Sequence, residues 1–279
     1  MMQAEVGDIS IRYQVSGQGP WLTLSHSLAS DNSMWKPQIE ALTPHFTILS
    51  YDTRGHGGTT VTKGSYTLEQ LANDAAGLLS YLGVSRTHWL GLSMGGMIGQ
   101  KFALQYPEKL DRVILADTTG FVAPVGAAMW HERAAAARAS GMAALEQGTL
   151  SRWFTDDFCQ KEPKVVDSIG ALIRATAVEG YAGCCAALAQ TNMLDSLKAL
   201  QIPALVLVGE NDNATPVAAA QAIASHWPGA KLKILHSAAH LANVEQAQAF
   251  NEAVLEFLAP SSPVQLRSIG ELAKGCLQN

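Results

Sequence analysis

Residues 89–96 read WLGLSMGG, an apolar run that leads directly into a serine with a glycine two positions away on each side. Gly91, Ser93 and Gly95 form the pattern G-x-S-x-G, and the residues that follow predict a helix that ends before Pro107. A serine on a tight turn between a strand and a helix has unfavourable backbone angles, so these neighbours must be small. The N-terminus of the following helix stabilises developing negative charge. The stretch therefore predicts a nucleophilic serine at residue 93.

Two other interpretations of this stretch are weaker. The first is a strand that simply ends in a turn, because a bare G-x-S-x-G occurs often by chance. The strand before the serine and the helix after it are what favour a nucleophile. The second is a dinucleotide-binding fingerprint, G-x-G-x-x-G, which would need glycine at position 93, where this chain has serine.

Apolar strands and amphipathic helices alternate along most of the chain. Strands are predicted at residues 4–6, 10–15, 21–25, 46–52, 88–93, 112–117, 203–209 and 231–236, and helices at 35–42, 68–82, 95–106, 217–226 and 245–258. Nearly continuous apolar strands are typical of a sheet that is covered on both faces. The alternation predicts an α/β protein with a mostly parallel central sheet and helices on both faces.

The alternation is interrupted at residues 122–198, which are rich in alanine and show helical patterns alone. We expect this segment to be a helical cap inserted into an α/β core made of residues 1–121 and 199–259. Residues 260–279 open with serine and proline and have mixed character. They are expected to form a poorly ordered, poorly attached extension.

A nucleophilic serine needs a base, and the base needs a group that orients it. In this topology the partners follow in the order serine, acid, histidine, each just beyond a later strand. Asp212 follows the strand predicted at 203–209, and His240 follows the strand predicted at 231–236. We therefore predict Ser93, Asp212 and His240 as a catalytic triad. Asp117 also ends a strand and is the alternative acid.

The oxyanion formed by attack on a carbonyl needs two backbone donors. One is expected from the N–H of Met94, directly after the nucleophile. The other is expected from the loop after the strand at 21–25, where Leu28 is the best candidate. Trp35, Trp130 and Trp153 are candidates to line the substrate pocket, although ordinary packing explains each of them equally well.

The composition argues against several classes of protein. The 279 residues are 48% hydrophobic, enough for a sizeable core, and the net charge of −5 argues against nucleic acid or an anionic membrane as the main partner. The start of the chain lacks the pattern of a secretory signal, and no apolar run reaches the about 18 residues of a membrane span. A cytoplasmic location is the default expectation, and self-association stays open.

No metal or organic cofactor is expected. The cysteines are Cys159, Cys184, Cys185 and Cys276. Their spacing fits neither a zinc site nor a disulfide framework. Small buried side chains with reduced thiols are the simpler interpretation.

Residues 1–259 resemble the α/β-hydrolase superfamily. The motifs are SHSLASDNSMW (25–35), YDTRGHGGT (51–59), GLSMGG (91–96), GENDNATP (209–216) and AAHLANVEQAQAFN (238–251). Dehalogenases and many epoxide hydrolases of this superfamily carry Asp at the position of Ser93, so the serine argues against both of these activities. Within the superfamily the chain is most similar to 3-oxoadipate enol-lactonases and related esterases, with further cues in RWFTDDF (152–158) and EGYAGCCAALA (179–189).

This resemblance implies a serine hydrolase that cleaves small carboxylic esters or lactones through an acyl-enzyme. The chain departs from the usual pattern at the oxyanion loop, where His26 is followed by Ser27 instead of glycine. An enol-lactone with a free carboxylate needs a cationic clamp. Arg133 is the candidate for that clamp and Arg138 is its only cationic neighbour in HERAAAARAS (131–140), so neutral esters or lactones stay open as substrates.

Two other functions also stay open. A broad-specificity carboxylesterase with perhydrolase or haloperoxidase-like side activity would use the same triad. A non-catalytic receptor for small molecules would belong to a different class, and the presence of all three triad residue types favours the enzyme.

Overall fold

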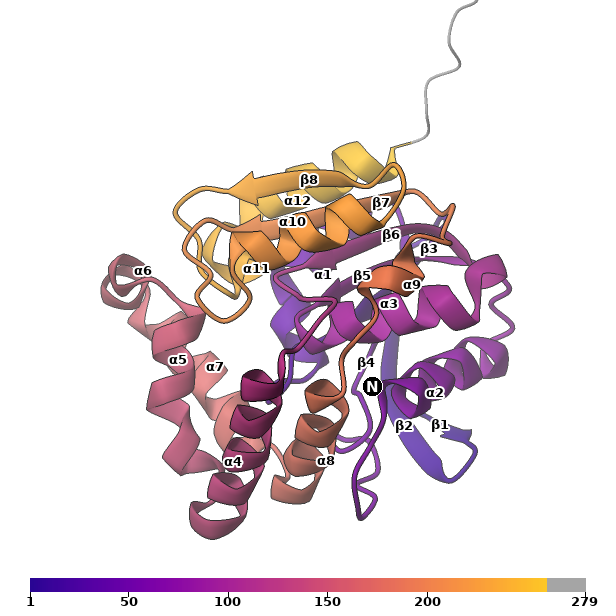
Figure 1. Ribbon diagram of the computed structural model, residues 1–279. Helices are drawn as coiled ribbons and strands as arrows, with labels where there is room; N and C mark the ends of the chain where they lie inside the picture. Colours follow the sequence, from indigo (N-terminus) through magenta and orange to yellow (C-terminus); the bar gives the residue numbers. More distant parts are fainter. Residues whose placement is uncertain (260–279) are drawn as a thin grey trace, which may run out of the picture.

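The computed structural model describes residues 1–259, and its centre is an eight-stranded sheet in the order β1-β2-β4-β3-β5-β6-β7-β8 (Figure 1). The pairs β1–β2 and β2–β4 are antiparallel, and the other neighbouring strands are parallel. The prediction of a mostly parallel central sheet is confirmed. The strands are β1 (Met2–Val6), β2 (Ile9–Ser16), β3 (Trp21–Ser25), β4 (Thr47–Tyr51), β5 (Thr87–Leu92), β6 (Leu110–Ala116), β7 (Ala204–Gly209) and β8 (Lys231–Leu235).

The burial of the strands explains their sequence patterns. Every residue of β5 and β7 is buried, because helices cover both faces of the sheet there. The antiparallel strand β2 instead alternates, with Ile9, Ile11 and Tyr13 buried and the residues between them partly exposed. A strand that packs on one face only needs apolar residues at every second position.

Two layers of helices cover the sheet. The helices α2, α3, α9 and α10 pack together on one face, and α1, α11 and α12 pack together on the other (Figure 1). Their bounds are α1 (Lys36–Leu42), α2 (Leu68–Tyr81), α3 (Met94–Gln105), α9 (Leu194–Leu197), α10 (Val217–His226), α11 (Ala242–Glu245) and α12 (Ala247–Leu258), with short 3₁₀ turns at Asn32–Trp35, Pro107–Lys109 and Met142–Leu145. Within residues 1–259, no helix combines the length and the apolar character that crossing a membrane requires.

The alanine-rich segment forms a group of helices beside the sheet (Figure 1). They are α4 (Pro124–Ser140), α5 (Glu146–Trp153), α6 (Asp156–Lys161), α7 (Pro163–Ala175) and α8 (Val178–Ala189). The two ends of the insertion meet, since the N–H of Val122 donates to the oxygen of Thr191 at 2.9 Å and that of Met193 to Gly120 at 2.8 Å. The boundaries at 122 and 198 stay predictions, and α9 already packs on α3 and α10. The extension expected at 260–279 lies outside the described residues.

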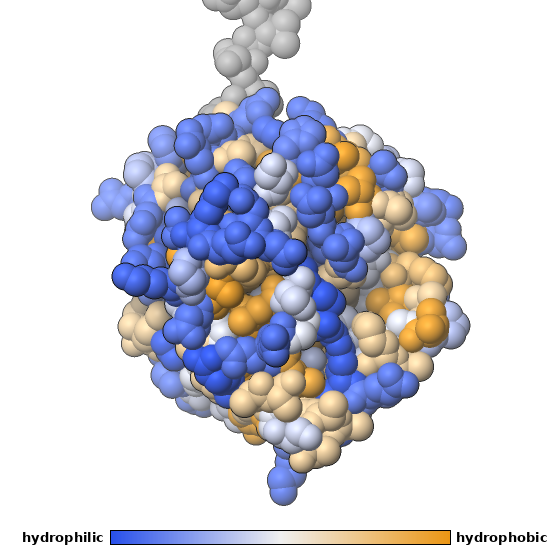
Figure 2. All heavy atoms as spheres, turned by 90° about the vertical axis from the view of Figure 1, so that its left-hand side faces the viewer, coloured by the Kyte–Doolittle hydropathy of each residue, from blue (hydrophilic) through white to orange (hydrophobic). Residues whose placement is uncertain are grey.

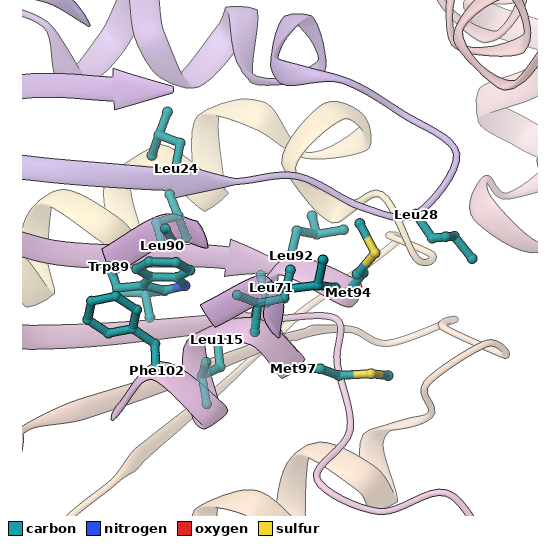
Figure 3. Packing of buried hydrophobic residues seen from close by; sticks show 14 of the residues in the cluster. Leu24, Leu28, Leu71, Trp89, Leu90, Leu92, Met94, Met97, Phe102 and Leu115 are labelled. Carbon is teal, nitrogen blue, oxygen red and sulfur yellow. The ribbon is translucent and has the colours of Figure 1, made fainter. Parts of the chain in front are cut away.

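An aromatic pair anchors α3 to the sheet beneath it (Figure 3). The rings of Trp89 on β5 and Phe102 on α3 stack with their centres 5.0 Å apart, and both side chains are fully buried. The indole nitrogen of Trp89 donates to the carbonyl oxygen of Gly95 at 3.2 Å. The start of α3 is therefore fixed on the end of β5.

A buried arginine joins three segments at the antiparallel side of the sheet. Arg54, which follows β4, donates two hydrogen bonds of 2.7 Å each to Asp74 on α2. It donates two more, of 3.0 and 2.8 Å, to Asp8 in the β1–β2 turn. Arg54 is only 3% exposed and Asp74 8%, so Asp74 without Arg54 would be a buried charge with no partner.

We expect Arg54→Met to lower the free energy of unfolding by about 3 kcal/mol, because it leaves the Asp74 carboxylate buried without a counter-charge. Urea denaturation measures this loss. The control is Arg86→Met, which breaks the exposed pair with Asp111 and should cost under about 1 kcal/mol. Equal losses for the two variants would show that burial of the Arg54 pair makes no difference.

Candidate active site

Ser93 lies between the last residue of β5 and the first residue of α3, and its backbone has φ 54° and ψ −113°. A positive φ in a residue with a side chain costs on the order of 1–3 kcal/mol. The flanking glycines are required by close contacts. A Cβ on Gly91 would lie 2.1 Å from the oxygen of Gly95, and a Cβ on Gly95 would lie 1.9 Å from the oxygen of Ser25. Larger side chains would therefore force this turn apart.

Hydrogen bonds from the neighbouring strand hold the strained turn. The N–H of Ser93 donates to the oxygen of Ala116 at the end of β6 at 2.9 Å. The hydroxyl of Thr118 donates to the carbonyl oxygen of Ser93 at 2.7 Å. With both of its backbone polar groups fixed in this way, Ser93 keeps its hydroxyl at the carboxyl end of the sheet.

The structure brings together the three residues that the sequence proposes as a triad. The Oγ of Ser93 lies 2.9 Å from Nε2 of His240, and Nδ1 of His240 lies 2.9 Å from Oδ2 of Asp212. The three side chains are nearly buried, with 8%, 3% and 3% of their residue surfaces exposed for Ser93, His240 and Asp212. This arrangement can move a proton from the hydroxyl to an imidazole that a carboxylate orients.

Asp212 is held by donors from its own loop, β7–α10. Its Oδ1 accepts the N–H groups of Ala214 and Thr215 at 2.8 and 2.9 Å, and its Oδ2 accepts the hydroxyl of Thr215 at 2.7 Å. Burial acts to raise the pKa of the Asp212 carboxyl, but the adjacent His240 and these hydrogen bonds outweigh it and hold the pKa below the usual value. Sequence reasoning missed Thr215, although a threonine three residues after the acid is a common turn signal.

Asp117, the alternative acid, lies next to the site in a different role. It follows β6 with φ 45°, is fully buried, and accepts the N–H of Gly209 at 2.8 Å through Oδ1. Its Oδ2 has no hydrogen-bond partner among residues 1–259. Burial and the nearby charge of Asp212 raise its pKa well above the usual value. The geometry therefore favours Asp212 as the partner of His240.

The two expected oxyanion donors come from different segments of the chain. Met94 opens α3, and Leu28 lies in the loop after β3 (Figure 3). Two buried histidines hold this loop. His26 donates from Nδ1 to the oxygen of Ser27 at 2.7 Å, and Nε2 of His56 accepts the N–H of Ala29 at 3.1 Å. Burial lowers the pKa of both imidazoles, that of His56 to about 3.

A small cavity of about 130 Å³ opens beside the Ser93 hydroxyl. Of the predicted lining residues, Trp130, Arg133 and Trp153 reach it. Trp35 does not, because its ring is fully buried under the sheet and packs against Phe250, 6.5 Å away between ring centres. Lining residues that the sequence analysis did not single out include Met129, Met142, Thr149, Arg152, Tyr181 and Asn213.

The cavity has two arginines in its wall. The guanidinium of Arg133 lies over the ring of Trp130, 5.1 Å from its centre. Arg152 donates a weak hydrogen bond of 3.4 Å to the hydroxyl of Thr149, and burial together with the charge of Arg133 lowers its pKa. Neither arginine forms an ion pair with an acidic side chain in the described part of the chain. Arg138, in contrast, pairs with Glu179 at the surface.

The three cysteines among residues 1–259 do not line this cavity. Cys184 and Cys185 are buried in α8, and burial raises the pKa of the Cys185 thiol to about 12. Cys159 is partly exposed, and Cys276 lies outside the described residues. Among residues 1–259, no group of three or more His, Cys, Asp or Glu side chains is arranged to hold a metal ion.

Comparison with known proteins identifies the family of the chain. The family model described as alpha/beta hydrolase fold matches residues 20–247. The chain is 38% identical to 3-oxoadipate enol-lactonase 2 of Acinetobacter baylyi over 88% of this chain and 92% of that protein. The crystal structure of the enol-lactonase from Burkholderia xenovorans superimposes with a TM-score of 0.90 at 38% identity, covering 93% of this chain and 100% of the other. A thermophilic esterase from Thermogutta terrifontis superimposes with a TM-score of 0.89 at 29% identity, covering 92% and 98%. The chain belongs to the alpha/beta hydrolase fold family.

Proposed function

We propose that this chain is a serine hydrolase that opens carboxylate-bearing lactones, in the manner of the 3-oxoadipate enol-lactonases to which it is similar. Its family and its 38% identity to one of these enzymes make it a hydrolase of the lactonase or esterase type. The observation that carries the finer proposal is the continuous hydrogen-bonded path from Ser93 through His240 to Asp212.

In the first half of the reaction, the Oγ of Ser93 attacks the carbonyl carbon while Nε2 of His240 takes the hydroxyl proton. Asp212 keeps the Nδ1 proton of His240 directed away from the serine and stabilises the imidazolium. The carbonyl oxygen becomes an oxyanion, which the N–H groups of Leu28 and Met94 stabilise. When the tetrahedral intermediate collapses, the ring C–O bond breaks and the leaving oxygen receives the proton from His240.

In the second half, water attacks the acyl-enzyme. His240 takes a proton from the water, and Ser93 leaves with that proton to give the free acid.

The leaving hydroxyl of a lactone stays tethered to the acyl group and could close the ring again, because effective molarities reach about 10⁵ M or more for well-placed groups. An enol leaving group avoids this return, since it becomes a ketone, which is a poor nucleophile.

The substrate carboxylate is assigned to Arg133. Its side chain lines the cavity that holds Ser93, and it has no acidic partner of its own among residues 1–259. A guanidinium without a counter-ion, partly withdrawn from water, favours an anionic ligand over a neutral one. Arg152 in the same wall adds a second positive charge to the cavity.

A neutral His56 helps to hold the loop that carries the expected oxyanion donor Leu28. A neutral imidazole has one nitrogen that accepts a hydrogen bond, and His56 uses it for the N–H of Ala29, next to Leu28. Protonation of His56 would turn that acceptor into a donor facing another donor. The low pKa of His56 therefore keeps the loop geometry over the working range of pH.

Ser93→Ala should lower kcat/KM for a short p-nitrophenyl ester and for a carboxylated enol-lactone by at least about 10³-fold, since the nucleophile is lost. Ser225→Ala, at an exposed position on α10, is the matched control and should keep wild-type activity. A folded Ser93→Ala protein with more than about a tenth of wild-type activity would exclude Ser93 as the nucleophile.

Arg133→Ala should raise KM for the carboxylated enol-lactone about tenfold or more, because a charged hydrogen bond contributes about 1.5–3 kcal/mol. KM for a neutral ester should change by less than about twofold, which corresponds to about 0.4 kcal/mol of binding free energy. Arg138→Ala, on the same helix but paired with Glu179 at the surface, is the control. If the acidic and the neutral substrate lose affinity equally, Arg133 does not bind a carboxylate.

The stability of the protein should fall as the pH drops from about 6.5 toward 3, in part because of His56. Its pKa is lowered from 6.5 to about 3 in the folded protein, so within this window only the unfolded chain takes up the proton. Relative to wild type, His56→Gln should reduce the slope of unfolding free energy against pH by up to about 1.4 kcal/mol per unit. Urea titrations at several pH values measure the slope, with the exposed His131→Gln as control. An unchanged slope would mean that His56 is accessible to protons in the folded state.

A further inference from the structure

The residues on both sides of His240 are linked to the segment that joins α5 to α6, Leu241 by a direct hydrogen bond and Ala239 through Glu245. The N–H of Leu241 donates to the carbonyl oxygen of Trp153 at 3.0 Å. The N–H of Ala239 donates to Oε2 of Glu245 at 2.8 Å. The other oxygen of Glu245 accepts the N–H of Thr155 at 3.2 Å and also the Thr155 hydroxyl. The histidine is therefore bracketed by two connections to residues 153–155.

Glu245 is a buried acceptor of three of these hydrogen bonds. It is the last residue of α11, is 9% exposed, and its three donors come from two segments about 85 residues apart in the chain. No cationic side chain forms an ion pair with it in the described chain. Burying a carboxyl group is costly unless it is well hydrogen-bonded. The hydrogen bonds of Glu245 therefore connect the loop that carries His240 to the α5–α6 junction.

Thr155 performs two functions with one hydroxyl. As the N-cap of α6 it accepts the N–H of Phe158 at 3.2 Å, and it donates its hydroxyl hydrogen to Glu245. A hydroxyl can both accept and donate, so the two bonds are compatible. The position of α6 is thereby linked to the carboxyl group that holds the His240 loop.

The same junction contacts the substrate cavity. Trp153 and Arg152 line the cavity next to Ser93, and the ring of Trp153 lies 6.3 Å from that of His240 between centres. Glu245, Ala239 and Thr155 line a neighbouring groove of about 790 Å³ between α5, α6 and the loops after β7 and β8, and this groove shares Arg152 and Asn213 with the cavity. Figure 2 faces the side of the molecule on which α5 and α6 lie and shows apolar surface flanked by hydrophilic side chains there.

We propose that Glu245 is a positioning residue for the reaction: its bonds to Thr155 and Ala239 set His240 relative to Ser93 according to the position of the α5–α6 junction. The inference rests on the proposed triad. A general base must stay within hydrogen-bond reach of its nucleophile, and a displacement of about 1 Å can cost about 100-fold in rate. A substrate that displaces Trp153 or Arg152 thus changes the position of His240 through this junction.

The first test uses Glu245→Gln and Thr155→Val. The amide of glutamine presents an NH₂ group where one carboxylate oxygen accepted a donor, and valine removes the hydroxyl while keeping the shape of threonine. Each variant should lower kcat about 10- to 100-fold, while KM for a neutral ester changes by less than about threefold. Thr155→Ser, which keeps the hydroxyl, should restore kcat to within about threefold of wild type.

Two controls separate positioning from general loss of stability. Thr67→Val removes the hydroxyl of another helix N-cap, that of α2, far along the chain from His240. Glu179→Gln changes an exposed glutamate on α8 that is paired with Arg138. Both should keep wild-type kcat even where denaturation shows lower stability. The double variant Glu245→Gln/Thr155→Val should be no slower than the slower single variant, since both changes break the same contact.

The rate of covalent labelling by a fluorophosphonate gives a readout that needs no substrate. Wild type should label at Ser93, and Glu245→Gln and Thr155→Val should label about 10- to 100-fold more slowly. If wild type is not labelled at Ser93, the proposed triad fails. If wild type is labelled and the folded variants react equally fast, with kcat unchanged, the triad stands and the role of Glu245 is refuted. Should Glu245→Gln not fold, the comparison of Thr155→Val with Thr155→Ser decides the question alone.

Discussion

The hydrogen bond between Ser93 and His240 depends on the whole parallel sheet, because it joins residues 147 positions apart. The two side chains meet only because β5 and β8 end at the same edge of the sheet, with β6 and β7 between them. The turn at Ser93 adds the final step, since its positive φ lifts the hydroxyl out of the line of the strand. The hydrogen bonds of Ser93 with Ala116 and Thr118 come from β6 and the residues that follow it. The strain at the nucleophile is therefore held by the order of the strands.

Two buried carboxyl groups at this edge show how position decides chemistry. Asp117 and Asp212 both follow strands of the parallel sheet, and the charge of Asp212 helps to raise the pKa of Asp117. Asp212 has donors from Ala214 and Thr215 and the imidazole of His240, which stabilise its charge. Asp117 accepts a hydrogen bond from the N–H of Gly209 and lies near the N–H of Ala242, which outweigh neither its burial nor the nearby charge of Asp212. Two neighbouring buried carboxyl groups do not both ionise easily, so the group with more hydrogen-bond donors and the adjacent imidazole takes the charge.

The sequence predicts the triad because its signals are local. Ser93 has its glycines, Asp212 and His240 each follow an apolar strand, and parallel strands bring their carboxyl ends to one edge. Trp35 shows where such reasoning stops: an aromatic residue after the oxyanion loop can face the cavity or the core, and only packing against Phe250 decides it. Glu245 and Thr155 meet across 90 residues, and no spacing rule in the sequence links them. The same holds for Arg152, whose place in the cavity wall depends on how α5 packs among the neighbouring helices.

The small volume of the cavity sets a condition on how a substrate enters. Its volume of about 130 Å³ is smaller than the roughly 300–1,000 Å³ of usual ligand sites. Residues 153–155 are tied to both neighbours of His240, so movement there would carry the base away from Ser93. On the opposite wall, α4 contributes Met129, which is 40% exposed, and Arg133. Under the proposed function, a substrate that enters on the side of α4 leaves the contacts of His240 intact and brings its carboxylate toward Arg133.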